Sequence, residues 1–221
     1  MHAALKDMAL VCWDLDGTLI DSAPDLATAL DAVLAERGLA PAGLAGVRDW
    51  IGNGARRLVE RALTARSGSA PSAAELEAAH GAFLDHYRQA PCVETRLYPG
   101  VAACLRSLEQ RGLKQVLITN KPGDFIAPIL QALGIGSHFE RTLGGDALER
   151  KKPDPAPLLH IARELQVAPE RALMIGDSRN DIEAGRAAGF RTLALSWGYN
   201  HGEPIAASDP DYLLDSLEGL I

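Results

Sequence analysis

One short stretch constrains the fold of this chain more than any other. The apolar run Leu10–Trp13 ends abruptly in Asp14 and Asp16, which flank a single leucine. A short continuous apolar run is typical of a strand that is buried on both faces of a parallel sheet. Residues two apart on a strand point to the same side, so the two carboxylates would share one space if the strand continued. If the chain turns instead, Gly17 gives it the freedom to do so.

Neighbouring carboxylates at the end of a buried strand are costly unless a cation or a shared proton relieves their repulsion. A hard divalent cation such as Mg²⁺ prefers oxygen ligands of this kind. Asp14 and Asp16 alone therefore fit either a metal-assisted site or a solvated acidic turn. Residues elsewhere in the chain are needed to distinguish these two interpretations.

The composition of the chain limits the kinds of partner that it is expected to bind. Its 221 residues carry a net charge of −7, and nucleic acids or anionic membranes generally bind basic patches, so we expect neither partner. The three cysteines, Cys12, Cys92 and Cys104, are widely spaced and predict neither a disulfide framework nor a zinc site. The apolar run Met8–Trp13 is too short to span a membrane, and no signal-peptide pattern precedes it, which predicts a cytoplasmic protein.

The segment after the acidic stretch shows helical periodicity only. Its start, Ser22-Ala-Pro-Asp25, has the pattern of a capping box, in which a Ser and an acid three residues later cap a helix. Apolar residues then recur at helical spacing as far as Gly38, and a linker of small residues leads to the turn Trp50–Gly54. Two further helices are predicted, one directly after this turn and one whose apolar face carries Leu76, Ala79, Phe83 and Tyr87.

From Leu97 onward strands alternate with helices, which is the pattern of βαβ units in a parallel sheet. Strands are predicted at 114–119, 141–143, 172–176 and 191–195, helices at 100–110, 125–133, 155–165 and 181–188, and a terminal strand and helix at 212–220. We expect a doubly wound, Rossmann-like α/β core formed by residues 1–20 and 97–221. Residues 21–96 would be an inserted helical cap over the strand ends, where open α/β sheets bind ligands.

Polar residues stand at the ends of three further predicted elements. They are Thr119 and Asn120 after one strand, Asp177 and Asp181 after another, and Lys151 and Lys152 ahead of Pro153 at a helix start. Each set alone also fits an ordinary strand end, helix cap or solvated charge pair. Parallel strands end at one edge of a sheet, so together these residues would bring acids, a basic group and small hydrogen-bonding groups into one site. Phosphoryl transfer needs such a set, because it depends mainly on positioning and on neutralising charge.

Four ordered motifs carry a family resemblance. They are Asp14–Thr18, Leu117–Asn120, Lys152–Pro155 and Gly176–Asp181. They resemble the motifs of the haloacid dehalogenase-like hydrolases, in particular the phosphatases with a helical cap, and the likeness runs from about residue 9 to about residue 205. Trp13 departs from the family, which usually carries Phe before its nucleophile, but a larger aromatic side chain there should still pack.

The resemblance implies a role for each matching residue. Asp14 would be the nucleophile that forms an aspartyl-phosphate, and Asp16 would be the general acid and then the general base. Thr119 would hold a phosphate oxygen, with Asn120 beside it, and Lys152 would offset the negative charges. The family places Mg²⁺ on Asp14, on the main-chain carbonyl of Asp16 and on Asp177, with Asp181 as a second acid nearby.

Within the family the chain most resembles the bacterial phosphatases of 2-phosphoglycolate. The stretches that carry this likeness are Trp50–Gly54, Val59–Leu63, Thr119–Pro122 and Trp197–Asn200 with Gly202 and Glu203. It implies a small phosphorylated substrate whose carboxylate meets Gly52, Asn53 and Gly54, because main-chain N–H groups at a helix start bind anions. Whether Arg56 or His201 also contacts the substrate is left open.

Other functions fit the same motifs. A phosphatase of another small metabolite, or a sugar-phosphate mutase of the same family, would share all four motifs. A signalling module that accepts phosphate on Asp14 is a further alternative, although such a module needs neither a cap nor the acid Asp16. The sequence does not distinguish Mg²⁺ from Mn²⁺ or predict an oligomeric state.

Overall fold

The computed structural model describes residues 2–221. Its centre is a six-stranded sheet of order β5-β4-β1-β6-β7-β8, and every neighbouring pair of strands is parallel. The strands are β1 (Leu10–Trp13), β4 (Lys114–Ile118), β5 (Arg141–Leu143), β6 (Ala172–Gly176), β7 (Arg191–Leu195) and β8 (Tyr212–Leu214). The strand order reverses at β1, so the sheet is doubly wound and the predicted fold class is confirmed.

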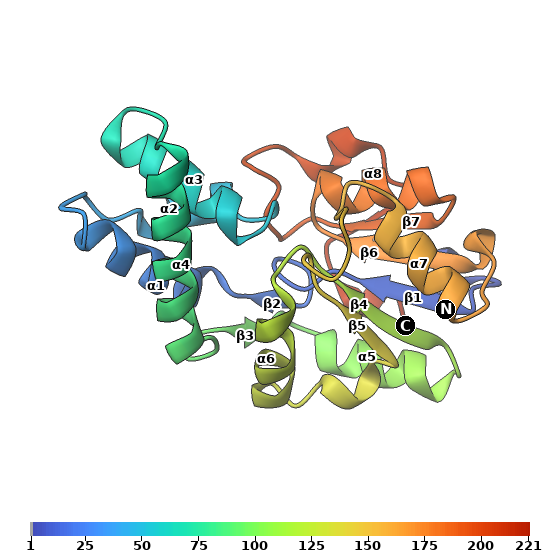
Figure 1. Ribbon diagram of the computed structural model, residues 1–221. Coiled ribbons are helices and arrows are strands. Elements are labelled where there is room, and N and C mark those ends of the chain that lie inside the picture. Colours follow the sequence, from blue (N-terminus) through green and yellow to red (C-terminus); the bar gives the residue numbers. More distant parts are fainter. Residues whose placement is uncertain (1) are drawn as a thin grey trace.

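Helices cover both faces of the sheet, with α7 (Ala156–Glu164) and α8 (Arg179–Ala188) on one face and α5 (Val101–Gln110) and α6 (Ile126–Ala132) on the other (Figure 1). Strand β1 is buried throughout because its alternate residues enter the two layers. Leu10 and Cys12 join the core of the first layer, and Val11 and Trp13 join that of the second. Trp13 packs without exposure, and its indole N–H donates to Oε1 of Gln115 at 3.2 Å.

Most predicted elements of the sheet and its helices agree with the structure to within two residues. Helix α8, for example, begins at Arg179 rather than at Asp181. The terminal helix is shorter than predicted, since only the 3₁₀ turn Leu217–Gly219 follows β8. No helix within residues 2–221 is long and apolar enough to cross a membrane.

Four helices lie between β2 (Ile20–Asp21) and β3 (Arg96–Leu97), which pair as a short antiparallel ribbon. They are α1 (Ala23–Ala35), α2 (Gly43–Trp50), α3 (Ala55–Ser67) and α4 (Ala73–Gln89), and Figure 1 shows them as a group beside the sheet. Helix α2 lies where the sequence predicted a linker, so that prediction is wrong. Only Val47 of its eight residues is buried, so the sequence lacks the apolar stripe that reveals a helix.

The predicted capping box at the start of α1 is wrong, because its two side chains bind elsewhere. Ser22 makes no side-chain capping bond, and its Oγ donates instead to Oδ1 of Asp16 at 2.5 Å. Asp25 accepts hydrogen bonds from the main-chain N–H groups of residues 93–95, at 2.8 to 3.1 Å, and from Oγ1 of Thr95 at 2.6 Å. Asp25 therefore ties the first helix to the chain segment that returns to the sheet.

Candidate active site

The predicted site residues meet at the carboxyl edge of the sheet, where Asp14 follows β1, Thr119 follows β4 and Asp177 follows β6. A cavity of about 40 Å³ lies here, between the strand ends and the helices α1, α3 and α4. The predicted residues that line it are Asp14, Asp16, Gly52, Gly54, Thr119, Asn120, Lys152 and Asp181. Asn53 and Asp177 line neighbouring cavities instead.

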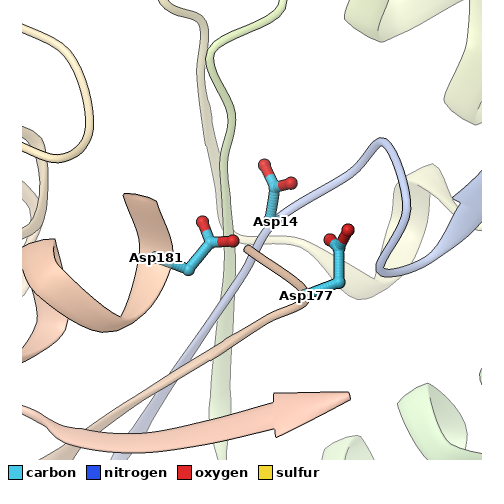
Figure 2. A group of neighbouring side chains, drawn as sticks. All are labelled: Asp14, Asp177 and Asp181. Carbon is cyan, nitrogen blue, oxygen red and sulfur yellow. The ribbon is translucent and has the colours of Figure 1, made fainter. Parts of the chain in front are cut away.

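Three buried carboxylates form the centre of the site (Figure 2). Asp14, Asp177 and Asp181 each offer an oxygen atom, and these oxygens lie within 4.8 Å of one another. Two glycines allow this crowding. A Cβ at Gly17 would lie 2.1 Å from Oδ2 of Asp177, and a Cβ at Gly176 would lie 2.2 Å from Cγ of Asp181, so no larger residue fits at either position.

Hydrogen bonds fix two of these carboxylates. Oγ1 of Thr18 and the main-chain N–H of Tyr199 each donate to Asp177 at 2.5 Å. The main-chain N–H and the Oγ of Ser178 donate to Oδ2 of Asp181, at 3.1 and 2.8 Å. The orientation of both acids is therefore set by the protein itself, as is typical of groups around a metal site.

Lys152 is the cation at this centre. Its Nζ donates to Oδ1 of Asp14 at 2.8 Å, to Oδ1 of Asp181 at 2.7 Å and to the carbonyl oxygen of Ile118 at 2.6 Å. Burial alone would lower the pKa of Lys152, but the charges of Asp14 and Asp181 outweigh it and raise the pKa above its ordinary value. Lys152 therefore stays charged.

The charges at this centre do not balance. Three carboxylates and one ammonium leave a surplus of two negative charges in a buried space. Burial raises the pKa of Asp14 to about 7, against the effect of Lys152, and burial together with Asp14 and Asp181 raises the pKa of Asp177. A divalent cation would remove exactly the surplus of charge that raises these pKa values, and oxygen atoms are the ligands that such cations prefer. The residues present therefore fit a divalent metal ion.

Asp16 lies outside the carboxylate cluster, although it lines the same cavity. Its Oδ1 accepts hydrogen bonds from Oγ of Ser22 at 2.5 Å and from Nζ of Lys121 at 2.9 Å. Its side chain is thus held by one residue at the start of α1 and by one that follows β4, and these bonds leave its main-chain carbonyl uninvolved.

Lys121 is a site residue to which the sequence analysis gave no role. Its side chain is only 3% exposed, and its Nζ lies 4.7 Å from the ring centroid of Tyr87 in α4. Burial acts against its charge, but Asp16 and Tyr87 raise the pKa of Lys121 above its ordinary value. The signal in the sequence is its position two residues after Thr119, just past the end of a strand that was already expected to point into the site.

Asn120 joins the two sides of the cavity. Its Nδ2 donates to the carbonyl oxygens of Gly52 and Lys152, both at 2.9 Å. Asn53 does not line the cavity, and its Oδ1 accepts from Arg61 at 2.7 Å while its Nδ2 donates to Oδ1 of Asn180 at 3.3 Å. The amide of Asn53 and the Nδ2 of Asn120 are therefore occupied by protein groups, whereas the buried Oδ1 of Asn120 has no hydrogen-bond partner among the described residues. Gly52 and Gly54 remain in the lining.

Arg56 and His201, whose contact with the substrate the sequence did not decide, lie outside the lining of this cavity. Arg56 is half exposed and lies 3.8 Å from Glu77 within the helical group. Nδ1 of His201 lies 3.0 Å from the carbonyl oxygen of Asp49, so His201 contacts the end of α2. Neither side chain lines the cavity that holds Asp14.

A doubly wound parallel sheet with buried acids and a lysine at its carboxyl edge defines a class of phosphate-handling α/β enzymes. Residues 8–189 match the model of the haloacid dehalogenase-like hydrolases, and the chain belongs to this family. It is 47% identical over 213 residues to "Phosphoglycolate phosphatase 1" of Pseudomonas aeruginosa, covering 96% of this chain and 78% of that protein.

Two further relatives match nearly end to end. The "Phosphoglycolate phosphatase" of Nitrosococcus oceani is 44% identical, over 96% of this chain and 95% of its own length. A crystal structure described as a predicted phosphoglycolate phosphatase from Haemophilus somnus superposes with a TM-score of 0.93 at 36% identity, covering 98% of this chain and 97% of that chain.

Proposed function

We propose that this hydrolase is a metal-dependent phosphomonoesterase in which Asp14 is the nucleophile. The observation that carries this proposal is the state of Asp14. One of its oxygens is held by Lys152, it stands beside two further buried acids, and it opens onto the cavity. A carboxylate fixed in this way can attack phosphorus, and the resulting aspartyl-phosphate divides one difficult displacement into two easier ones.

The remaining residues would share the work of phosphoryl transfer. Asp16 would donate a proton to the leaving oxygen and then accept one from the attacking water. Thr119, which is buried in the cavity wall, would bind a phosphate oxygen, and Lys152 would offset the charge shared by Asp14 and the phosphate.

We assign Mg²⁺ as the divalent cation. Asp14, Asp177 and the main-chain carbonyl of Asp16 would hold it, with Asp181 beside them, and its role when bound is to neutralise charge on the phosphate. The surplus of two negative charges at the carboxylate cluster supports a divalent ion, and the all-oxygen donor set supports a hard one.

The substrate that these observations support best is 2-phosphoglycolate. The relatives with 44 to 47% identity carry that name, and the small cavity favours a substrate of few atoms. Helix α3 begins at the cavity, with Gly54 as its N-cap and Ala55 in the lining. The free N–H groups of its first turn favour a negatively charged group on the side away from the phosphate.

The division into an α/β core (1–20 and 97–221) and a cap (21–96) belongs to the same proposal. The cavity lies between the two parts, so a substrate would enter when they separate, and the short β2–β3 ribbon would be the hinge. A phosphatase of another small phosphorylated metabolite, or a mutase, remains the alternative. We place the protein in the cytoplasm because its three cysteines suggest a reducing compartment.

The test is release of phosphate from a panel of phosphomonoesters, with and without Mg²⁺. The panel contains 2-phosphoglycolate, a hexose phosphate and an aryl phosphate, and sugar-phosphate interconversion is followed in parallel. We expect continuous, Mg²⁺-dependent release that is fastest with 2-phosphoglycolate. Asp14→Asn should abolish it, and Asp85→Asn, which changes an exposed carboxylate of α4, is the control. Wild-type activity in Asp14→Asn would contradict the role of Asp14, and interconversion without release would indicate a mutase.

A further inference from the structure

The cavity has a polar floor and an apolar roof. Asp14, Thr119 and Lys152 belong to the floor. The roof is formed by Leu26, Ile51, Leu58, Phe83 and Tyr87 of the helical group, and Phe125, which follows β4, packs against Tyr87 with ring centroids 4.8 Å apart. A ligand bound at the floor can extend a second charged group toward this roof. That group needs an opposite charge nearby, because an unpaired charge is costly in apolar surroundings.

Among the described residues, two cations line the cavity, and they differ in the use of their N–H donors. An ammonium group has three such donors. Those of Lys152 are all engaged, by Asp14, Asp181 and the carbonyl of Ile118. Lys121 donates to Oδ1 of Asp16 at 2.9 Å, and its other polar neighbour is the hydroxyl of Tyr87, over whose ring it lies.

Lys121 is therefore a buried ammonium that still has at least one free donor. Its side chain is 3% exposed, so bulk water has little access to it. Within residues 2–221, no second carboxylate or carbonyl oxygen accepts from its Nζ. A buried cation that lines a cavity with an unused donor is a binding site for an anionic group of a ligand.

The place of Lys121 matches the chemistry of the proposed substrate. Asp16, its partner, would protonate the ester oxygen that leaves with the glycolate. A single CH₂ group separates that oxygen from the carboxylate of 2-phosphoglycolate. A phosphate next to Asp14, bound by Thr119 and with its charge offset by Lys152, would therefore place the carboxylate close to Nζ of Lys121 and Asp16.

We infer that Lys121 binds the carboxylate of the substrate and determines the preference for phosphomonoesters that carry an anionic group one carbon from the ester oxygen. Asp16 holds the ammonium in the empty enzyme, and the substrate carboxylate shares it or takes it over. This inference rests on the proposed function, and it adds a full positive charge to the partial charge of the α3 N-terminus in the lining of the same cavity.

The test measures binding of two compounds that are not hydrolysed, so that proton transfer by Asp16 plays no part. 3-Phosphonopropionate is 2-phosphoglycolate with CH₂ in place of the ester oxygen, and propylphosphonate lacks the carboxylate. Titration calorimetry with saturating Mg²⁺ gives both dissociation constants. We expect the wild-type enzyme to prefer 3-phosphonopropionate, and Lys121→Met to reduce that preference about 10- to 100-fold, the range of one charge-assisted hydrogen bond.

A second pair of variants keeps the test valid if Lys121→Met leaves Asp16 unpaired and unfolds. Asp16→Asn removes the negative charge that pairs with the ammonium and should strengthen binding of 3-phosphonopropionate more than binding of propylphosphonate. The double variant Asp16→Asn with Lys121→Met carries no charge at either position and should lose this gain. Lys151→Met is the matched control, because Lys151 lies outside the cavity lining and donates to the carbonyl of Asn53. It should leave the preference unchanged.

The outcomes separate this inference from the proposed function. A preference that stays within twofold of wild type in Lys121→Met, or in the double variant relative to Asp16→Asn, would overturn the role of Lys121. If the enzyme then still hydrolysed 2-phosphoglycolate best, the proposed function would stand without it. An enzyme that releases no phosphate from 2-phosphoglycolate would overturn both.

Discussion

Lys152 and Asp14 lie 138 positions apart in the sequence, yet Nζ of Lys152 donates to Oδ1 of Asp14 at 2.8 Å. The same ammonium also donates to Asp181 and to the carbonyl of Ile118. Three fixed acceptors hold the charge in one place, so in the proposed reaction it would neutralise a phosphate on Asp14 without rearrangement. Groups that are fixed in this way before the reaction give the largest electrostatic contribution to catalysis.

Replacing this lysine should therefore impair catalysis far more than replacing its neighbour. Lys152→Met should lower kcat about 100- to 1,000-fold, the usual loss when one fixed charge-stabilising donor is removed. Lys151→Met, which removes an exposed ammonium next to it, should change kcat less than about fivefold. Steady-state phosphate release measures both, with circular dichroism to show that each variant is folded. Equal losses in the two variants would mean that Lys152 acts only through the net charge of the region.

The loss of activity on replacing Asp16 should depend on how easily the leaving group departs without a proton. An aryl phosphate releases a stabilised phenolate and needs little protonation, whereas an alkyl phosphate depends on it. Asp16→Asn should lower turnover of an alkyl phosphate about 100- to 10,000-fold, the usual range for general acid–base catalysis. Formation of the aspartyl-phosphate from an aryl phosphate should be affected much less, as measured by the burst of phenolate in rapid mixing. If both substrates lost the same factor, Asp16 would not be the proton donor.

Metal binding should change the stability of the protein through Asp177. Without metal, Asp177→Asn should raise the melting temperature, because it removes one of three crowded carboxylates. With Mg²⁺, the wild-type protein should instead have the higher melting temperature. A ligand at 100 times its dissociation constant stabilises a protein by about 2.7 kcal/mol, and the variant should lose most of this gain. Differential scanning calorimetry with and without Mg²⁺ measures both effects. Asp154→Asn, on the loop before α7, is the control, and the same Mg²⁺ response in both variants would argue against a metal site at Asp177.

The bond between Asp25 and the returning chain should make stability depend on pH. Burial opposes the charge of Asp25, but the hydrogen bonds from Thr95 and from the N–H groups of residues 93–95 outweigh it and lower the pKa of Asp25. A lowered folded-state pKa means that this stabilisation is complete above the unfolded-state pKa of about 3.9 and is lost as the pH falls through the folded-state pKa.

Asp25→Asn should therefore destabilise the protein at pH 7 by about 2 kcal/mol, the size of a charged hydrogen bond. The difference from wild type should begin to shrink below about pH 4, where Asp25 gains a proton in the unfolded chain but not yet in the folded protein. Urea unfolding at several pH values measures this, and Asp31→Asn, on the same helix, serves as the comparison. A difference that stays constant from pH 7 to pH 3 would show that the charge of Asp25 contributes nothing.

The sequence by itself determined the sheet and the catalytic edge. The apolar run that ends at Asp14 predicted a buried strand, and the strands at 114, 172 and 191 were predicted from composition and spacing. Because parallel strands end at one edge, Asp14, Thr119 and Asp177 could be placed in one site without coordinates. Local residue patterns carry this information, since strand periodicity and parallel pairing are short-range and general.

Only the tertiary structure decided which partner each polar side chain has. Ser22 and Asp25 look like a helix cap in the sequence, but one binds Asp16 and the other binds a segment about 70 residues away. Lys121 follows Thr119 at a strand end, and nothing local shows that its ammonium lies beside Asp16 in an apolar cavity. A hydrogen bond or an ion pair forms between groups that folding brings together, so its partners are set by how whole elements pack and not by the pattern of residues around either group.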